Sequence, residues 1–219
     1  MSPSPPDDLP RVIPVFPLSG VLLLPHGKLP LNIFEPRYLQ MTEDAMASHR
    51  LIGMVQPVDP ADMDEQPAIY PTGCVGRITS FSETDDDRYL IALSGIARFH
   101  IHRELPPDGL LYRRVEADFT PYNDDFDSRV ELRLDRGQLL PALHDFFDQK
   151  GLSANWDAIN QSEDGDLLTS LAMVCPFSPS EKQALLECES DTIRADMLIA
   201  LIEMARHELN AGIDLGAQQ

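Results

Sequence analysis

Closely spaced cysteine pairs are missing from this sequence of 219 residues. Its three cysteines, Cys74, Cys175 and Cys188, lie far apart and form no C-x-x-C pair. An odd and scattered set is unsuited to a disulfide framework or a zinc site, and it is typical of proteins from the reducing cytosol. We therefore expect a cytoplasmic protein that holds no metal through cysteine.

Long apolar runs are missing as well. The most apolar stretch near the N-terminus, residues 20–41, is interrupted by Pro25, Pro30 and Pro36, and its longest unbroken run is 21–24. A membrane-spanning helix needs roughly 20 apolar residues. The first residues of the chain also show no basic segment followed by an apolar one. We therefore expect neither a membrane span nor a signal peptide.

Positive charge is scarce. Lysine and arginine together number 17, against 36 aspartates and glutamates, so the formal net charge is −19. Such a chain repels nucleic acid and anionic membrane surfaces. We expect neither as a partner, and we interpret most of the acidic residues as a surface that keeps the protein soluble.

Motifs for nucleotide binding and for catalysis are absent. Six residues separate Gly20 from Gly27, where a phosphate-binding loop has four, and Leu29 replaces the hydroxyl residue that should follow Lys28. The sequence contains neither G-x-S-x-G nor H-E-x-x-H. The pattern predicts a protein that binds no nucleotide and is not an enzyme.

Two segments contain potential metal ligands, but neither has the full set of ligands that a metal site needs. His100 and His102 lie on one face of an expected strand, but no third ligand can be named beside them. The acidic segment 123–127 lacks the glycine and the distal glutamate of a calcium-binding loop, and a hinge with turns suits it better. We therefore expect no metal and no other cofactor.

Short strands are the main feature of the first half of the chain. Apolar residues alternate with polar ones at 114–119, which indicates a half-buried strand. Similar segments are 12–16, 31–34, 51–55, 74–82, 89–94 and 98–102. Several short strands separated by proline-rich turns favour a mostly antiparallel barrel or sandwich.

Helical spacing dominates the second half. It is found at 130–147, with a bend at Pro141, and at 167–174 and 193–204, where Gly212 is expected to end the last helix. Ser178 and Glu181 predict a capping box at the start of another helix. The fold class is therefore α+β. We expect a disordered tail at 1–10, a β subdomain at 11–122 and a helical subdomain at 123–219.

One crowded corner, "IFEPRYLQM", stands out as a candidate site. Pro36 suits a first helical turn, so a helix should begin there, directly after a strand. Two interpretations remain open: a purely structural corner, or an edge that binds an extended peptide through aromatic and charged side chains. For the second interpretation, the predicted protein-binding residues are Phe34, Glu35, Arg37, Tyr38 and Met41.

Several segments resemble a known family. The stretch "IPVFPLSGVLLLPHGKLPLNIFEPRYLQM" is similar to the start of the N-terminal, substrate-binding domain of Lon proteases. The resemblance continues at "LIGMVQP", "VGRITSF", "YLIALSGIARFHI" and "LLTSLAMVCPFSPSEKQALLE", and covers about residues 11–206. It implies a PUA-like β-barrel followed by a helical bundle, as in the stand-alone Lon-domain proteins of bacteria.

The resemblance also implies a function in protein recognition linked to proteolysis. We expect a non-catalytic module that binds an unfolded polypeptide or a specific protein partner, without the ATPase and protease modules of a full Lon protease. Two alternatives remain. One is a hydrolase whose unrecognised active site lies in a cleft between barrel and helices, and the other is a structural domain that associates with itself.

The missing phosphate-binding loop generates a first prediction. Calorimetric titration with ATP and Mg²⁺ should detect no binding in the micromolar range in which enzymes commonly bind substrates. A saturable heat of binding in that range would contradict this prediction.

Overall fold

The computed structural model describes residues 9–62, 64, 66–126 and 132–216, with side chains up to residue 206. Two compact units make up the chain. The first consists of residues 1–128 together with 173–187, and the second of 129–172 together with 188–219. Residues 1–8 of the expected tail at 1–10 and the helical pattern at Val130 lie outside the described residues. The predicted subdomain boundary after residue 122 stays a prediction.

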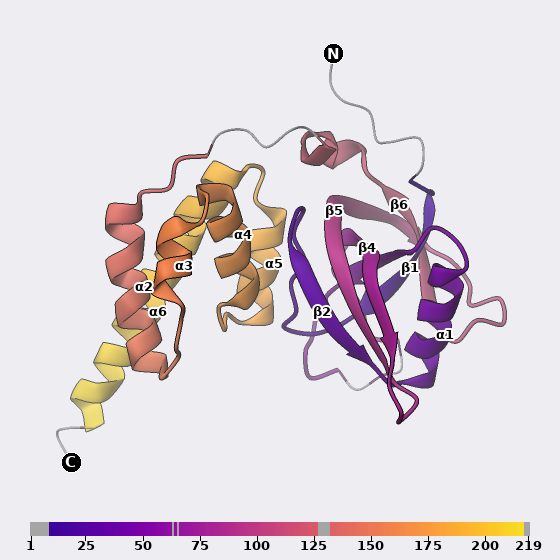
Figure 1. Cartoon of the computed structure of the whole chain (residues 1–219), viewed down its shortest axis with the longest axis horizontal. Helices are drawn as coiled ribbons and strands as arrows, with labels where there is room; N and C mark the ends of the chain where they lie inside the picture. The colour runs from indigo at the N-terminus through magenta and orange to yellow at the C-terminus, as the bar shows by residue number, and fades with distance from the viewer. Residues whose placement is uncertain (1–8, 63, 65, 127–131, 217–219) are drawn as a thin grey trace. The chain divides into compact units, whose positions relative to one another are not determined.

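Six strands in the first unit form one sheet that closes on itself. They are β1 (Val12–Pro17), β2 (Lys28–Ile33), β3 (Leu51–Val55), β4 (Thr72–Glu83), β5 (Tyr89–Glu104) and β6 (Arg113–Asp118). Their order is β2-β5-β4-β3-β1-β6, and a further pairing joins β5 to β6. Only the pair formed by β1 and β3 is parallel among these six strands. The predicted mostly antiparallel β-barrel is confirmed (Figure 1).

The long strand β5 makes this closure possible. The sequence predicted two segments around Gly95, but the structure has one strand of 16 residues. Its first part pairs with β2 and β4, and its last part pairs with β6. Register shifts interrupt its pairing with β4 and with β6. Such bulges bend a strand, so one strand can take part in both ends of the ring.

Alternating apolar side chains fill the barrel. Ile13, Val75, Phe99 and Val115 are fully buried in one cluster. A methyl group on Gly73 would lie 2.6 Å from the Phe99 ring. Only glycine leaves room for the ring at this point, so the packing of Phe99 depends on a residue without a side chain.

The apolar run 21–24 is neither a strand nor a membrane segment. Leu22, Leu23 and Leu24 are at most 3% exposed, although the backbone between β1 and β2 is irregular. The loop is fastened to β5 because the His26 N–H donates to the Gly95 carbonyl and the Gly95 N–H donates to the Gly27 carbonyl, at 3.0 and 2.8 Å. The leucines therefore contribute to the core from a loop.

Arg98 on β5 forms a buried ion pair. Its guanidinium binds the Asp125 carboxylate with a shortest distance of 2.7 Å, and the two side chains are 5% and 9% exposed. Asp125 belongs to the 3-10 helix η1 (Thr120–Phe126). The Arg98 backbone N–H also donates to Asp125, and Nη1 donates to the Leu186 carbonyl at 3.2 Å. One side chain thus joins three parts of the first unit.

Helix α5 (Pro179–Glu187) belongs to the same unit as the barrel and packs on β4. Its predicted capping box is confirmed, since the Ser178 N–H donates to Glu181 and the Glu181 N–H donates to the Ser178 hydroxyl. The buried Lys182 ammonium donates to the carbonyls of Gly20 and Met173, at 2.9 and 3.1 Å. Burial lowers the pKa of Lys182.

The second unit is helical. It contains α2 (Arg136–Lys150), α3 (Trp156–Gln161), most of α4 (Asp164–Val174) and α6 (Asp191–Gly216). Pro141 lies inside α2, and Gly151 ends α2 with a φ of 64°. The expectation that Gly212 ends the last helix is wrong, because α6 continues to Gly216. The sequence pattern did not predict α3, which is only six residues long.

Helix α1 (Pro36–Met46) begins where the sequence predicted and is anchored to the barrel on two sides. Tyr38 packs on Phe16 with ring centres 4.0 Å apart. On its polar side, Glu43 accepts a hydrogen bond from the Tyr89 hydroxyl at 2.8 Å, and Asp44 accepts one from the Tyr112 hydroxyl at 2.9 Å. Burial together with the bond to Asp44 raises the pKa of Tyr112 to about 12.

The buried ion pair generates the second prediction. Asp125→Asn removes the buried carboxylate that the Arg98 guanidinium contacts, and it should lower the free energy of unfolding by about 3 kcal/mol or more. Urea unfolding followed by circular dichroism measures this loss. The matched control Asp86→Asn removes the exposed partner of Arg88 and should leave the urea midpoint nearly unchanged. Equal midpoints for the two variants would contradict the role assigned to the buried pair.

The anchoring of α1 generates the third prediction. The folded pKa of Tyr112 is about 12, above its ordinary value of roughly 10, so folding favours the protonated phenol. This contribution to stability is fully present below about pH 10 and is lost as the pH rises through 12. Unfolding measured at pH 9, 10 and 11 should therefore show a smaller fall in stability for Tyr112→Phe than for the original chain. Identical slopes would refute the prediction.

Candidate functional site

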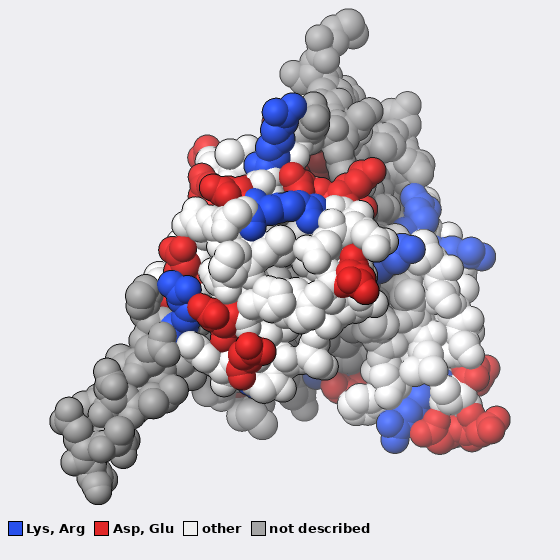
Figure 2. Space-filling view, turned by 60° about the vertical axis from the view of Figure 1, so that its left-hand side comes forward, with Lys and Arg blue, Asp and Glu red and all other residues white. Residues whose placement is uncertain are grey.

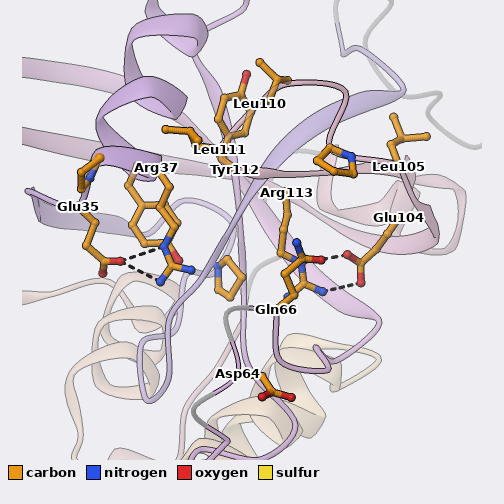
Figure 3. A pocket seen from close by; sticks show the side chains of 14 residues that line it. Glu35, Arg37, Asp64, Gln66, Glu104, Leu105, Leu110, Leu111, Tyr112 and Arg113 are labelled. Carbon is orange, nitrogen blue, oxygen red and sulfur yellow. Dashed lines mark hydrogen bonds and ion pairs between the residues drawn. The ribbon is translucent and has the colours of Figure 1, made fainter.

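A pocket with a volume of about 510 Å³ lies in the first unit, where α1 begins. Its walls come from the corner before α1, from the end of β5 and from the loop that leads into β6 (Figure 3). The lining residues are Pro17, Glu35, Pro36, Arg37, Tyr38, Asp64, Gln66, Glu104, Leu105, Pro107, Leu110, Leu111, Tyr112 and Arg113.

The structure divides the five residues predicted at this corner. Glu35, Arg37 and Tyr38 line the pocket, although Tyr38 is only 5% exposed. Phe34 is 58% exposed outside the pocket, and the Arg88 guanidinium lies 5.6 Å from its ring centre. Met41 is fully buried, so in this structure it supports the wall by packing and has no surface to offer to a partner.

An ion pair forms one side of the pocket. Arg37 Nε and Nη2 both lie close to Glu35 Oε2, at 2.9 and 2.8 Å. The Arg37 guanidinium also lies 4.5 Å from the centre of the Tyr38 ring. Burial is the main reason why the pKa of Tyr38 is raised. The extended backbone at Glu35, directly before the helix, places residues 35 and 37 side by side.

A second ion pair forms the opposite side (Figure 3). Arg113 on β6 binds Glu104 on β5 in a two-pronged arrangement, with Nη2 to Oε1 at 2.6 Å and Nε to Oε2 at 3.0 Å. Its Nη1 donates to the Pro67 carbonyl at 2.7 Å. The side chain of Arg113 is only 14% exposed, so this cation is held firmly in the wall.

Apolar side chains complete the pocket. Leu111 is 62% exposed, and its backbone N–H donates to Gln40 Oε1 on α1 at 2.8 Å. The sequence analysis did not predict this wall, because the apolar residues of the loop recur at neither helical nor strand spacing. The available signal was "PPDGLLYRR", in which two leucines directly follow a turn sequence. Asp108 and Gly109 form that turn, with φ angles of 48° and 81°.

The pocket is suited to binding. None of its described lining residues is a serine, threonine, cysteine, histidine or lysine, and both arginines are paired with carboxylates. Elsewhere in the first unit, burial raises the pKa of Cys175 to about 12, which leaves a poor nucleophile. Two charge pairs and the exposed Leu111 offer a ligand both hydrogen-bonding groups and apolar surface.

Neither a metal-binding cluster nor a membrane-spanning helix is present in the part of the chain that the structure describes. No group of three or more His, Cys, Asp or Glu residues in this part of the chain is placed to hold a metal ion. His100 and His102 lie exposed on β5. Among the described helices, none is both long and apolar enough to cross a membrane.

Charge is distributed in pairs over the surface. On the face shown in Figure 2, lysines and arginines lie beside aspartates and glutamates. The pairs include Arg11 with Glu116, Arg88 with Asp86, and Arg206 with Asp145. Acidic residues outnumber basic ones by 36 to 17, so there are too few basic side chains to pair one to one with every carboxylate.

Comparison with known proteins places this fold in a family. The family model of the ATP-dependent protease La (LON) substrate-binding domain matches residues 12–204. Lon protease 2 of Myxococcus xanthus is 24% identical over 208 residues, which cover 93% of this chain and 25% of that protein. Lon protease of Dictyoglomus thermophilum is 25% identical over 186 residues, covering 82% of this chain and 23% of that protein. The chain thus spans about a quarter of the length of these relatives.

Solved structures agree with this assignment. The Lon N-terminal domain protein from Xanthomonas campestris has a TM-score of 0.61 and 25% identity, and the match covers 86% of this chain and 97% of that one. The N-terminal domain of the Lon protease of the Mycobacterium avium complex has a TM-score of 0.57 at 14% identity, which shows a likeness of fold. With its barrel, its helices and a match over residues 12–204, the chain belongs to the family of Lon substrate-binding domains.

Proposed function

We propose that this protein binds extended segments of polypeptide in the pocket beside α1 and does not catalyse a reaction on them. The observation that carries the proposal is the composition of the pocket walls, in which the exposed Leu111 stands between two fixed ion pairs. The family assignment supports it, because the matching domain is described as substrate-binding.

The walls suggest how a segment is held. Apolar side chains of the segment would lie on Leu110 and Leu111, where burial of apolar surface is worth roughly 25 cal/mol per Å². Carboxylate oxygens and the Gln66 amide would accept or donate hydrogen bonds to the segment. Hydrogen bonds between α1 and the loop before β6 hold these walls in position. The pocket would therefore lose little conformational entropy when a segment binds.

We also propose that the protein acts in the cytoplasm, in a process related to proteolysis. The three cysteines are buried thiols, which agrees with a reducing compartment. The link to proteolysis rests on the relatives, which are Lon proteases by name. As part of the same proposal, the partner in the cell is an unfolded polypeptide or a specific protein.

The fourth prediction tests the pocket itself. A fluorescent 15-residue peptide with blocked ends, with leucines separated by glutamine and serine, should bind, and Leu111→Ser should weaken this binding about tenfold. Loss of one apolar contact of about 1.4 kcal/mol corresponds to that factor. Fluorescence anisotropy measures the dissociation constants.

The matched control is Leu90→Ser, because Leu90 is also exposed, at 46%, but does not line the pocket. It should bind the peptide like the original chain. Equal binding by the Leu111→Ser and Leu90→Ser variants would rule out the pocket, and no binding by the original chain would remove the proposed function.

A further inference from the structure

We propose that the pocket selects polypeptide segments that carry positive charge, with lysine or arginine close to an apolar residue. This inference rests on the proposed function and adds the chemistry of the segment that is bound. It follows from an inventory of which donors and acceptors in the walls are already engaged within the protein.

Arg113 is already engaged. Two of its nitrogens are bonded to Glu104 and a third to the Pro67 carbonyl, and only 14% of its side chain is exposed. A carboxylate on a ligand would therefore have to displace Glu104 from a two-pronged ion pair, the strongest type of hydrogen-bonded pair in the pocket walls.

Arg37 is engaged in a different way that leaves an acceptor open. Its Nε and Nη2 both bind the same oxygen, Glu35 Oε2 (Figure 3). The other oxygen, Glu35 Oε1, receives no hydrogen bond from the described residues, and the Glu35 side chain is 43% exposed. This wall therefore offers the ligand an acceptor while its cation is occupied.

Asp64 adds to the pocket a negative charge that no described basic side chain neutralises. It lines the pocket and is exposed, and its carboxylate forms no ion pair with any described residue. Its backbone N–H donates to the Asp62 carboxylate, which fixes the local turn. In Figure 3, Asp64 lies apart from both ion pairs. Since the two pairs cancel, the charged lining carries one net negative charge.

The electrostatic field of the whole chain also favours positively charged segments. With a net charge of −19, the protein attracts a cationic segment and repels an anionic one over distances of about 10 Å at 0.1 M salt. The long-range field selects the sign of the charge, and Glu35 and Asp64 select where in the pocket it lies. Leu111 would contact the apolar residue beside it.

Three end-blocked peptides test this inference. All three have leucine at the same positions as the neutral peptide above. They differ from one another at three further positions, which are glutamine in the first peptide, lysine in the second and glutamate in the third. We expect the lysine peptide to bind at least tenfold more tightly than the glutamine peptide, and the glutamate peptide at least tenfold more weakly. Anisotropy at 0.1 M salt gives the three dissociation constants.

Variants of the chain then locate the selectivity. Asp64→Asn should reduce the preference for lysine over glutamine at least threefold. The matched control Glu83→Gln makes the same change in net charge at an exposed position outside the pocket, and should reduce the preference less than twofold. Glu35→Gln removes the other acceptor carboxylate of the pocket wall and should likewise reduce the preference for lysine over glutamine at least threefold.

The outcomes separate this inference from the proposed function. If the glutamine peptide binds in a way that depends on Leu111, but the glutamate peptide binds as tightly as the lysine peptide, the inference is wrong and the proposed function stands. If Glu83→Gln and Asp64→Asn reduce the preference equally, the long-range field alone selects charge and the pocket assignment is wrong. If no peptide binds, both fail together.

Discussion

The ion pair of Arg98 with Asp125 is the interaction on which the first unit depends. β5 crosses from one end of the sheet to the other, and Arg98 lies near its middle. There the guanidinium fastens η1 through Asp125 and the end of α5 through the Leu186 carbonyl. The Tyr122 ring also lies 4.5 Å from it. A buried charge needs its partners, so segments distant in the sequence are held in one arrangement.

The position of the pocket walls depends on this arrangement of the barrel. Once β5 is fixed, its last residues and β6 place Glu104 and Arg113 beside each other. The loop between β5 and β6 is then held against α1 by hydrogen bonds to Gln40 and Asp44. These bonds hold the walls in place, while Leu111 stays exposed beside the carboxylates of Glu35 and Asp64. This combination is the basis of our proposal that the pocket binds cationic, partly apolar segments.

Sequence reasoning identified one half of this pocket and missed the other. Glu35, Arg37 and Tyr38 were predicted because aromatic and charged residues gather where a strand meets a helix that starts at Pro36. Met41 was predicted with them, but the helix places its side chain fully in the core. The loop with Leu111 gave no periodic signal. Its place beside α1 depends on hydrogen bonds across 68 and 71 residues.

Local features of the fold were determined by the sequence alone. Alternation predicted most strands, Pro36 predicted the start of α1, and Ser178 with Glu181 predicted the cap of α5, because each effect acts over a few residues. Tertiary structure decided the rest. The union of two segments into β5, the burial of the loop leucines at 22–24 and the partner of Arg98 all depend on residues far apart in the chain. Such contacts form because burial of apolar surface is favourable and because a buried charge requires a partner, and local sequence patterns carry no record of which distant segments meet.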